Sequence, residues 1–133
     1  MNHIQPVGLL IGRVLLAYIF VVAGFGKIGN FSATAAYMAS KGLPMSEVLL
    51  VATIVIELVG GLMIALGWKA RWAALAIFVF LIPTTLIFHA FWAVDPEQVR
   101  AQTIQFNKNL AIMGGMLYLA IVGSGRFGLD RGR

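Results

Sequence analysis

Four long apolar stretches constrain the fold of this chain more than any other feature. A helix needs about 20 predominantly apolar residues to cross the hydrocarbon core of a bilayer. Stretches of this kind lie at about 7–26, 48–67, 72–92 and 107–123. Charged residues make up only 11% of the chain, against about 25% in soluble domains. Too few polar side chains remain to cover a surface in water, so the sequence predicts an integral membrane protein.

The predicted fold is all-α, a transmembrane four-helix bundle that forms a single domain over residues 1–133. Four spans use about 80 positions, which leaves only connectors between them. No segment alternates apolar and polar residues as the strand of a membrane barrel does. Between the first two spans, residues 31–41 are predicted to form a short interfacial helix, with Ser32 as its cap and Gly42 at its end.

The two remaining connectors carry signals of their own. The polar turn from Gly67 to Arg71 is short, so the second and third spans must be antiparallel neighbours. Asp95 and Pro96 have the pattern of an N-cap followed by proline at the first helical position. We therefore expect a helix to start there and to continue into the fourth span.

The basic residues are scattered, although they outnumber the acidic ones by ten to five. They form no stripe that could follow a phosphate backbone, so the expected partner is the lipid bilayer rather than nucleic acid. In the four-span topology the bases divide six to four between the two membrane faces, which predicts cytoplasmic termini. The face of the termini carries Arg13, Lys69, Arg71, Arg126, Arg131 and Arg133, and the opposite face carries Lys27, Lys41, Arg100 and Lys108.

The first apolar stretch has a second interpretation as a cleaved signal peptide, with Arg13 at the end of its basic region. However, the segment before Arg13 is itself apolar, and no A-x-A cleavage site precedes Lys27. The sequence therefore favours a retained first helix.

Two charged residues lie inside predicted spans. Such groups cost about 2.5 to 3.5 kcal/mol at the centre of a membrane helix, so they usually have a partner. Glu57 lies near the middle of the second span and Arg13 about six residues into the first, so their depths differ by about 6 Å. We expect the two to pair. The pair is either a structural lock between the first two helices or a site where Glu57 carries protons or binds a ligand.

Paired glycines occur in two of the predicted spans. Gly60 and Gly61 follow Glu57 by one helical turn, and Gly114 and Gly115 lie in the fourth span. Glycine lets membrane helices approach closely, so we expect close helix contacts at these positions. The alternative is that they leave room for a flat ligand.

A polar cluster is predicted at the interface opposite the termini. Its members are Lys27, Thr85, His89, Trp92, Asn107, Lys108 and Asn109. Helical spacing predicts that Thr85, His89 and Trp92 line a shared wall. One interpretation is a hydrogen-bonded histidine beside an aromatic-belt tryptophan. The other is a pocket in which a lysine contacts an oxygen-bearing ligand, His89 exchanges a proton and Asn109 fixes the orientation. Such a pocket would suit a quinone headgroup.

Several kinds of chemistry find no support in the sequence. The chain has no cysteine, which excludes disulfides, thiolate metal sites and dithiol relays. His89 and Glu57 are about half a bilayer apart in the predicted topology, so they do not make a metal site. No phosphate-binding loop or nucleophilic constellation is present. The sequence thus shows no self-contained catalytic motif, and whether the protein is an enzyme stays open.

Seven short motifs occur in order along nearly the whole chain. They are Arg13-x-Leu15-Leu16, Ala23-Gly24-Phe25-Gly26-Lys27, Lys41-Gly42-Leu43-Pro44, Glu57-x-x-Gly60-Gly61, His89-x-x-Trp92, Phe106-x-Lys108-Asn109-Leu110 and Leu129-Asp130. Together they resemble the DoxX family of bacterial inner-membrane proteins. The resemblance implies a four-helix bundle in the cytoplasmic membrane. It also implies, for some members, a link to quinol or thiosulfate oxidation or to membrane oxidoreductase complexes that handle oxidative stress.

The residues and the resemblance together predict an accessory or quinone-interacting component of a membrane redox system. A bound quinone or a partner subunit would then supply the electron carrier. Two alternatives stay open. The first is binding or transport of a small lipophilic molecule, which Pro83 in the third span supports and which would require a homo-oligomer in so short a chain. The second is a purely structural partner subunit.

Overall fold

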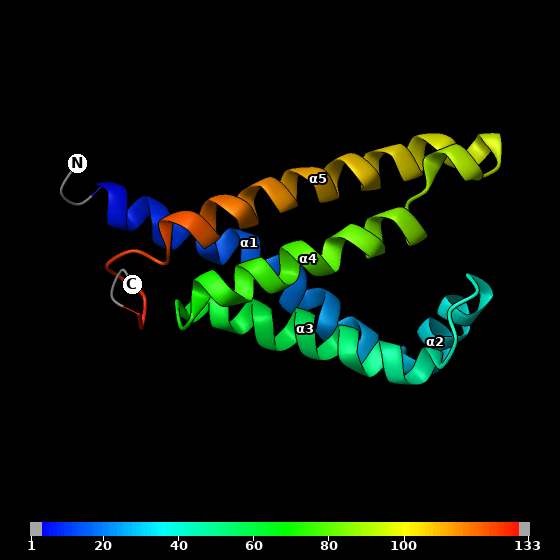
Figure 1. Cartoon of the computed structure of the whole chain (residues 1–133), viewed down its shortest axis with the longest axis horizontal. Helices are drawn as coiled ribbons and strands as arrows, with labels where there is room; N and C mark the ends of the chain where they lie inside the picture. Colours follow the sequence, from blue (N-terminus) through cyan, green and yellow to red (C-terminus); the bar gives the residue numbers. More distant parts are fainter. Residues whose placement is uncertain (1–3, 131–133) are drawn as a thin grey trace.

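The computed structural model describes residues 4–130, and in this range the regular structure is entirely helical. Five α-helices and two short 3-10 helices follow one another along the chain (Figure 1). Their bounds are α1 Ile4–Gly29, α2 Phe31–Ser40, α3 Ser46–Leu66, α4 Ala70–Phe88, η1 Phe91–Ala93, η2 Pro96–Gln98 and α5 Val99–Val122. The prediction of an all-α bundle with a short helix between the first two long ones is confirmed.

Three segments are long and apolar enough to cross a membrane: α1, α3 and the stretch Ala70–Ala93, which contains α4. The other long helix, α5, has 24 residues, but its first half carries polar side chains. This helix runs beside α4 along the bundle (Figure 1). The bundle therefore has four long helices, while a membrane crossing by α5 stays a prediction.

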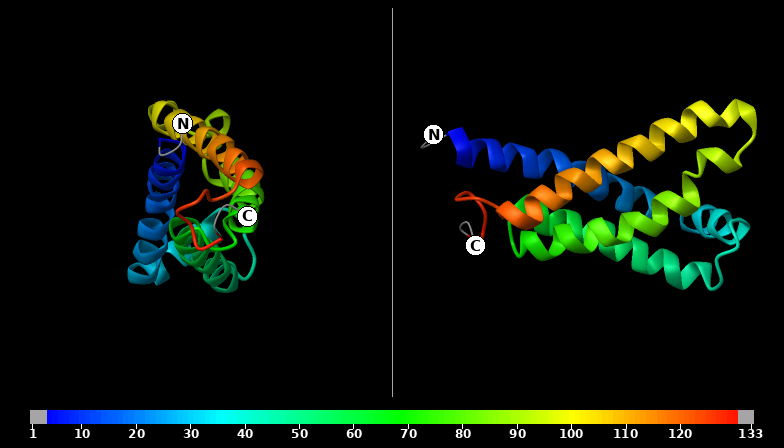
Figure 2. Two further views of the ribbon diagram at one scale, coloured as in Figure 1. Left: turned by 90° about the vertical axis from the view of Figure 1, so that its left-hand side faces the viewer. Right: turned by 45° about the horizontal axis from the view of Figure 1, so that its top comes forward.

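The long helices pack as two pairs. Helix α1 lies mainly against α3, and α4 lies mainly against α5, while the contact between α3 and α4 joins the pairs. The start of α1, the turn between α3 and α4, and the C-terminal segment 123–130 share one end of the bundle, called here the termini end (Figure 2). Helix α2 and the two 3-10 helices lie at the opposite end, called here the α2 end.

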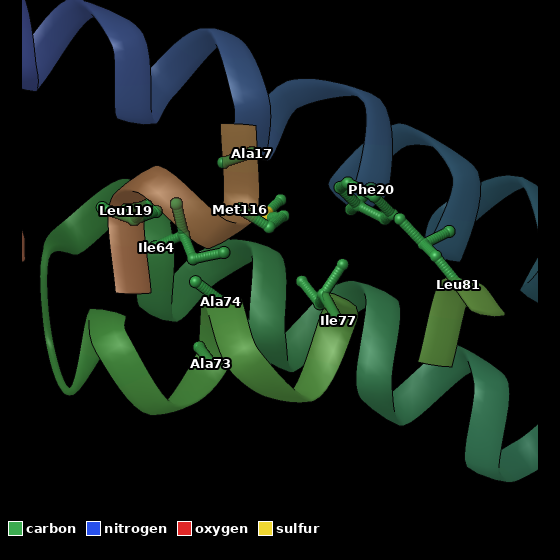
Figure 3. Packing of buried hydrophobic residues seen from close by; sticks show 9 residues of the cluster. All are labelled: Ala17, Phe20, Ile64, Ala73, Ala74, Ile77, Leu81, Met116 and Leu119. Carbon is green, nitrogen blue, oxygen red and sulfur yellow. The ribbon is translucent and has the colours of Figure 1, made fainter. Parts of the chain in front are cut away.

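The buried core lies between the helices and is small. Its main cluster comprises Ala17, Phe20, Ile64, Ala73, Ala74, Ile77, Leu81, Met116 and Leu119 (Figure 3). A second, smaller cluster of Ala35, Met38 and Leu50 lies between α2 and α3. Many large apolar side chains instead point outward, and Leu15, Trp72 and Tyr118 are each about 70% exposed or more. This outward apolar surface suits lipid rather than water.

Glycines set the closest helix contacts. A Cβ atom on Gly24 would lie 3.0 Å from the Leu58 Cβ, and one on Gly61 would lie 3.0 Å from the Val21 Cγ2. The predicted close contacts are also present at Gly60, beside α4, and at Gly115, beside α1. At Gly114 the prediction is wrong, because that position faces open space.

Alanine at position 24 should therefore weaken the contact between α1 and α3. Its Cβ would meet the Leu58 backbone nitrogen at 3.2 Å, and overpacking of this kind typically costs about 1 to 3 kcal/mol. Alanine at Gly12, where a Cβ would meet open space, should leave stability unchanged or raise it slightly. Unfolding of Gly24→Ala and Gly12→Ala in detergent micelles would compare the two, and equal stabilities would contradict the close packing.

The structure tests the helix-start and helix-end signals that the sequence predicted for α2 and α5. Gly42 ends α2 as expected, with φ of +85° and its N–H donating to the Ala39 carbonyl. The prediction that Ser32 caps α2 is wrong, because the helix already begins at Phe31. Pro96 opens η2 as predicted, and this turn runs directly into α5.

Candidate functional site

A cavity of about 220 Å³ lies at the α2 end of the bundle and is bordered by four helices. We call it the α2 cavity. Its lining residues are Lys27 from α1, Thr34, Tyr37 and Met38 from α2, Thr53 and Glu57 from α3, and Phe80, Thr84 and Phe88 from α4, followed by His89. Apolar and aromatic walls thus surround a small set of polar groups, as is usual for ligand sites.

The charged groups of the cavity are Lys27 and Glu57. The Lys27 Nζ lies 2.8 Å from the Glu57 Oε1, and the Glu57 residue is only 7% exposed. That distance is an ion-pair contact, although no donor among the described residues is aligned with this buried oxygen as in a directional hydrogen bond. The carboxylate therefore keeps unused acceptor capacity beside the cavity.

The expected pairing of Glu57 with Arg13 is wrong. Gly24 opposes Leu58 across the contact between α1 and α3, which places Lys27 close to the level of Glu57. Arg13 lies eleven residues before Gly24 on α1, or about 16 Å along the helix at the usual rise. Arg13 therefore belongs to the termini end of the bundle and not to the cavity.

Arg13 binds the backbone of the C-terminal segment. Its Nη1 donates to the Ser124 carbonyl at 2.8 Å, and its Nη2 donates to the Phe127 carbonyl at 3.3 Å. The Arg13 residue is only 2% exposed. These bonds give Arg13 a structural role that sequence reasoning missed, because backbone carbonyls leave no signal in a sequence.

Two further charged residues fix the termini end. The Asp130 carboxylate accepts from the backbone N–H groups of Lys69 and Ala70, at 2.9 and 3.1 Å. It thereby caps the start of α4, where the helix dipole favours an anion. Arg71 donates to carbonyls in the last turn of α5, at Ala120, Ile121 and Val122. The motif Leu129-Asp130 was the only sequence signal for this arrangement.

His89 lines the cavity, and its side chain is hydrogen-bonded to Gln102 of α5, which is not among the lining residues. Helix α4 ends at Phe88, and the His89 Nδ1 lies 2.9 Å from the Gln102 Oε1 on α5. Gln102 was not among the predicted site residues. The sequence did not indicate Gln102 as a partner of His89, because that contact depends on α5 lying beside α4.

The predicted polar cluster does not form a single pocket. Of its seven members, only Lys27 and His89 line the α2 cavity. Thr85 and Asn109 are buried and bonded to each other at 3.1 Å between α4 and α5. The shared wall of Thr85, His89 and Trp92 is wrong because α4 ends before His89.

The remaining members of the cluster face outward. Trp92 is 59% exposed and packs edge to face against Phe91 and Phe106. Asn107 and Lys108 lie on the exposed side of α5, where Lys108 donates to Gln105. These three residues are therefore placed at the α2 end but away from the cavity.

The hydroxyl groups of the three cavity threonines already donate hydrogen bonds to backbone carbonyls. Thr34 donates to the Asn30 carbonyl at 2.8 Å. Thr53 donates to Leu49 at 3.0 Å, and Thr84 donates to Phe80 at 2.8 Å. Each hydroxyl oxygen keeps lone pairs that can accept a further hydrogen bond. Within residues 4–130, no group of three or more His, Cys, Asp or Glu side chains is placed to hold a metal ion.

Comparison with known proteins identifies relatives along the chain. The sequence model of the DoxX family matches residues 8–90. Inner membrane protein YphA of Escherichia coli (strain K12) is 37% identical over 127 residues, covering 96% of this chain and 91% of that protein. Inner membrane protein YqjF of the same strain is 37% identical over 131 residues, covering 98% and 95%.

A more distant relative is the Surfeit locus protein 4 homolog of Schizosaccharomyces pombe (strain 972 / ATCC 24843). It is 27% identical over 123 residues, which cover 91% of this chain but only 36% of that protein. No solved structure matches the chain. The family match and the two similar bacterial proteins, both aligned over nearly their full length, show that this chain belongs to the DoxX family.

Proposed function

We propose that this protein is an accessory component of a redox system in the bacterial inner membrane and that it binds a quinone headgroup in the α2 cavity. The observation that carries the proposal is a nearly buried ion pair, Lys27 with Glu57, at the edge of a cavity with aromatic walls. A quinone ring needs both elements, because its faces are apolar and its two oxygens are polar.

The size of the cavity favours a single ring. Pockets for drug-sized ligands have volumes of about 300 to 1,000 Å³, whereas the α2 cavity measures about 220 Å³. A ring headgroup fits this space, and an isoprenoid tail would lie outside it in the lipid. Tyr37 and Phe88 stack at 5.7 Å at the edge of the cavity and would shield the bound ring.

The chemistry of the cavity side chains indicates which role each of them has toward the quinone. The Lys27 ammonium has three N–H groups, more than its single contact with Glu57 can use, and these can donate to a quinone oxygen. His89 places an imidazole on the cavity wall, where a ring nitrogen can form a hydrogen bond with the ring ligand. Electrons would come from a partner subunit or leave through one, since this chain's own residues provide no carrier.

The orientation in the membrane belongs to the same proposal. Both similar Escherichia coli proteins are named inner membrane proteins. The face of the termini carries six of the ten basic residues and the opposite face carries four, which favours cytoplasmic termini. The α2 cavity then lies toward the periplasmic side. Of the bases counted for this orientation, Arg131 and Arg133 lie outside the described residues.

Titration of the purified protein in nanodiscs with a short-chain benzoquinone tests the proposal. We expect saturable binding that becomes about tenfold weaker in the double variant Lys27→Met/Glu57→Gln, since this variant removes the ammonium that donates to a quinone oxygen. Lys108→Ala, which changes an exposed residue away from the cavity, should bind like the parent protein. Non-saturating partition that is equal in all variants would overturn the site.

A further inference from the structure

We propose that the α2 cavity discriminates between the two redox states of its ring ligand and prefers the dihydroxy form over the dicarbonyl form. We further propose that Gln102, acting through His89, is a specificity-determining residue for this preference. Both statements rest on the proposed function, because they concern the ligand of the same cavity. They follow from the balance of hydrogen-bond donors and acceptors on the cavity wall.

The neutral polar groups of the cavity are mainly acceptors. The hydroxyl hydrogens of Thr34, Thr53 and Thr84 already point to carbonyls of their own helices. Each threonine can therefore offer only oxygen lone pairs to a ligand. Three walls of the cavity, from α2, α3 and α4, present acceptors in this way.

His89 adds a fourth acceptor because of Gln102. The Gln102 atom that faces the His89 Nδ1, at 2.9 Å, is the side-chain carbonyl oxygen. A carbonyl oxygen only accepts, so the Nδ1 of a neutral imidazole must carry the hydrogen. The Nε2 is then left with a lone pair, and this nitrogen becomes an acceptor. In this way a residue of α5 sets the chemical character of an atom that α5 does not itself bring to the cavity.

The charged pair adds both kinds of group. Glu57 is an acceptor, and its buried Oε1 has no aligned hydrogen-bond donor among the described residues. The donors on the wall are Lys27, already paired with Glu57 at 2.8 Å, and the phenol of Tyr37, a residue that is 47% exposed. Acceptors therefore outnumber donors around the ligand.

A ring hydroxyl satisfies such a wall better than a ring carbonyl does. The hydroxyl can accept from Lys27 or Tyr37 and can donate to Glu57, His89 or a threonine, whereas the carbonyl can only accept. A bound dicarbonyl ring would displace water from the wall and leave acceptors without a donor. We therefore expect the dihydroxy ring to bind about tenfold tighter, as one unpaired buried group would produce.

Calorimetric titration in nanodiscs can measure this preference directly. The probes are one short-chain benzoquinone and the hydroquinone of the same ring, the latter kept reduced under anaerobic conditions. Gln102→Leu removes the acceptor that holds the Nδ1 hydrogen and should reduce the preference severalfold.

The tautomer of His89 provides a readout that a merely structural role of Gln102 would not move. In protein labelled with ¹⁵N at histidine, the His89 nitrogen signals, identified by their loss in His89→Ala, should show hydrogen on Nδ1. In Gln102→Leu, the hydrogen should shift toward Nε2. An unchanged tautomer in Gln102→Leu, or an unchanged preference between the two rings, would overturn the role of Gln102.

The outcomes separate this inference from the proposed function. Saturable binding of both rings with equal affinity, or tighter binding of the quinone, would leave the proposed function standing and overturn the preference. If neither ring saturates, the proposed function falls and the preference falls with it. Tighter binding of the hydroquinone that Lys108→Ala does not change would support both.

Discussion

Replacing Lys27 by methionine is expected to destabilise the folded bundle by about 3 to 5 kcal/mol, because it leaves the Glu57 carboxylate buried without its partner. The carboxylate is nearly inaccessible and lies 2.8 Å from the Lys27 Nζ. Thermal or SDS-induced unfolding in detergent micelles measures the loss.

Two matched variants decide whether the ion pair is the cause. The double variant Lys27→Met/Glu57→Gln removes both charges and should recover most of the lost stability. Lys108→Met removes an exposed lysine of the same bundle end and should change stability by less than about 0.5 kcal/mol. If Lys27→Met is no less stable than Lys108→Met, the pair does not contribute as we infer.

Replacing Gly67 by alanine is expected to be nearly as damaging, at the opposite end of the bundle. Gly67 ends α3 with φ of +70°, and a Cβ there would lie 2.5 Å from the Gly128 Cα and 2.7 Å from the Arg13 Nη1. The left-handed backbone alone costs a residue with a Cβ about 1 to 2 kcal/mol. The contact with Gly128 adds to this cost, since a backbone atom can move only if the C-terminal segment moves with it.

Gly42 supplies the matched control for that substitution. It ends α2 with φ of +85°, yet a Cβ at this position would meet nothing within 4 Å. Gly42→Ala should therefore show the backbone cost alone, about 1 to 2 kcal/mol, and Gly67→Ala should exceed it by about 2 kcal/mol or more. Equal losses in the two variants, measured by unfolding in micelles, would mean that the C-terminal segment is not packed against Gly67 as described.

The sequence was sufficient for the helices because their signals are local. Apolar length indicated the long helices, Gly42 marked the end of α2, and the short turn after Gly67 required antiparallel neighbours. Each of these signals depends on backbone geometry or on transfer of side chains into lipid. None of these signals shows which residues of two neighbouring helices lie at the same level.

The pairing of charges failed because it depends on register. Spans aligned end to end would place Glu57 nearest to Arg13, whereas the observed contact of Gly24 with Leu58 brings Lys27 to that level instead. Helix α1 begins earlier and extends further than its most apolar part. The connector that contains α2 is long enough to allow such an offset, so the boundaries of the spans could not fix it.

The predicted polar cluster failed for a different reason. It assumed that the third helix continues through His89 to Trp92, but α4 ends at Phe88 and the chain turns. His89 therefore lines the α2 cavity, while Trp92 lies outside with Phe106. Side chains three residues apart share a face only while the helix that carries them is continuous.

The partners of Arg13 have a consequence for how the protein is made. The guanidinium enters the membrane with the first helix, but the carbonyls that receive it belong to residues 111 and 114 positions later in the chain. Until ribosomal synthesis reaches them, the cation must rely on water or lipid phosphates drawn toward it. Early biogenesis of this protein should consequently depend on the anionic lipid content of the host membrane, even though both terminal nitrogens of that guanidinium have carbonyl partners in the finished bundle.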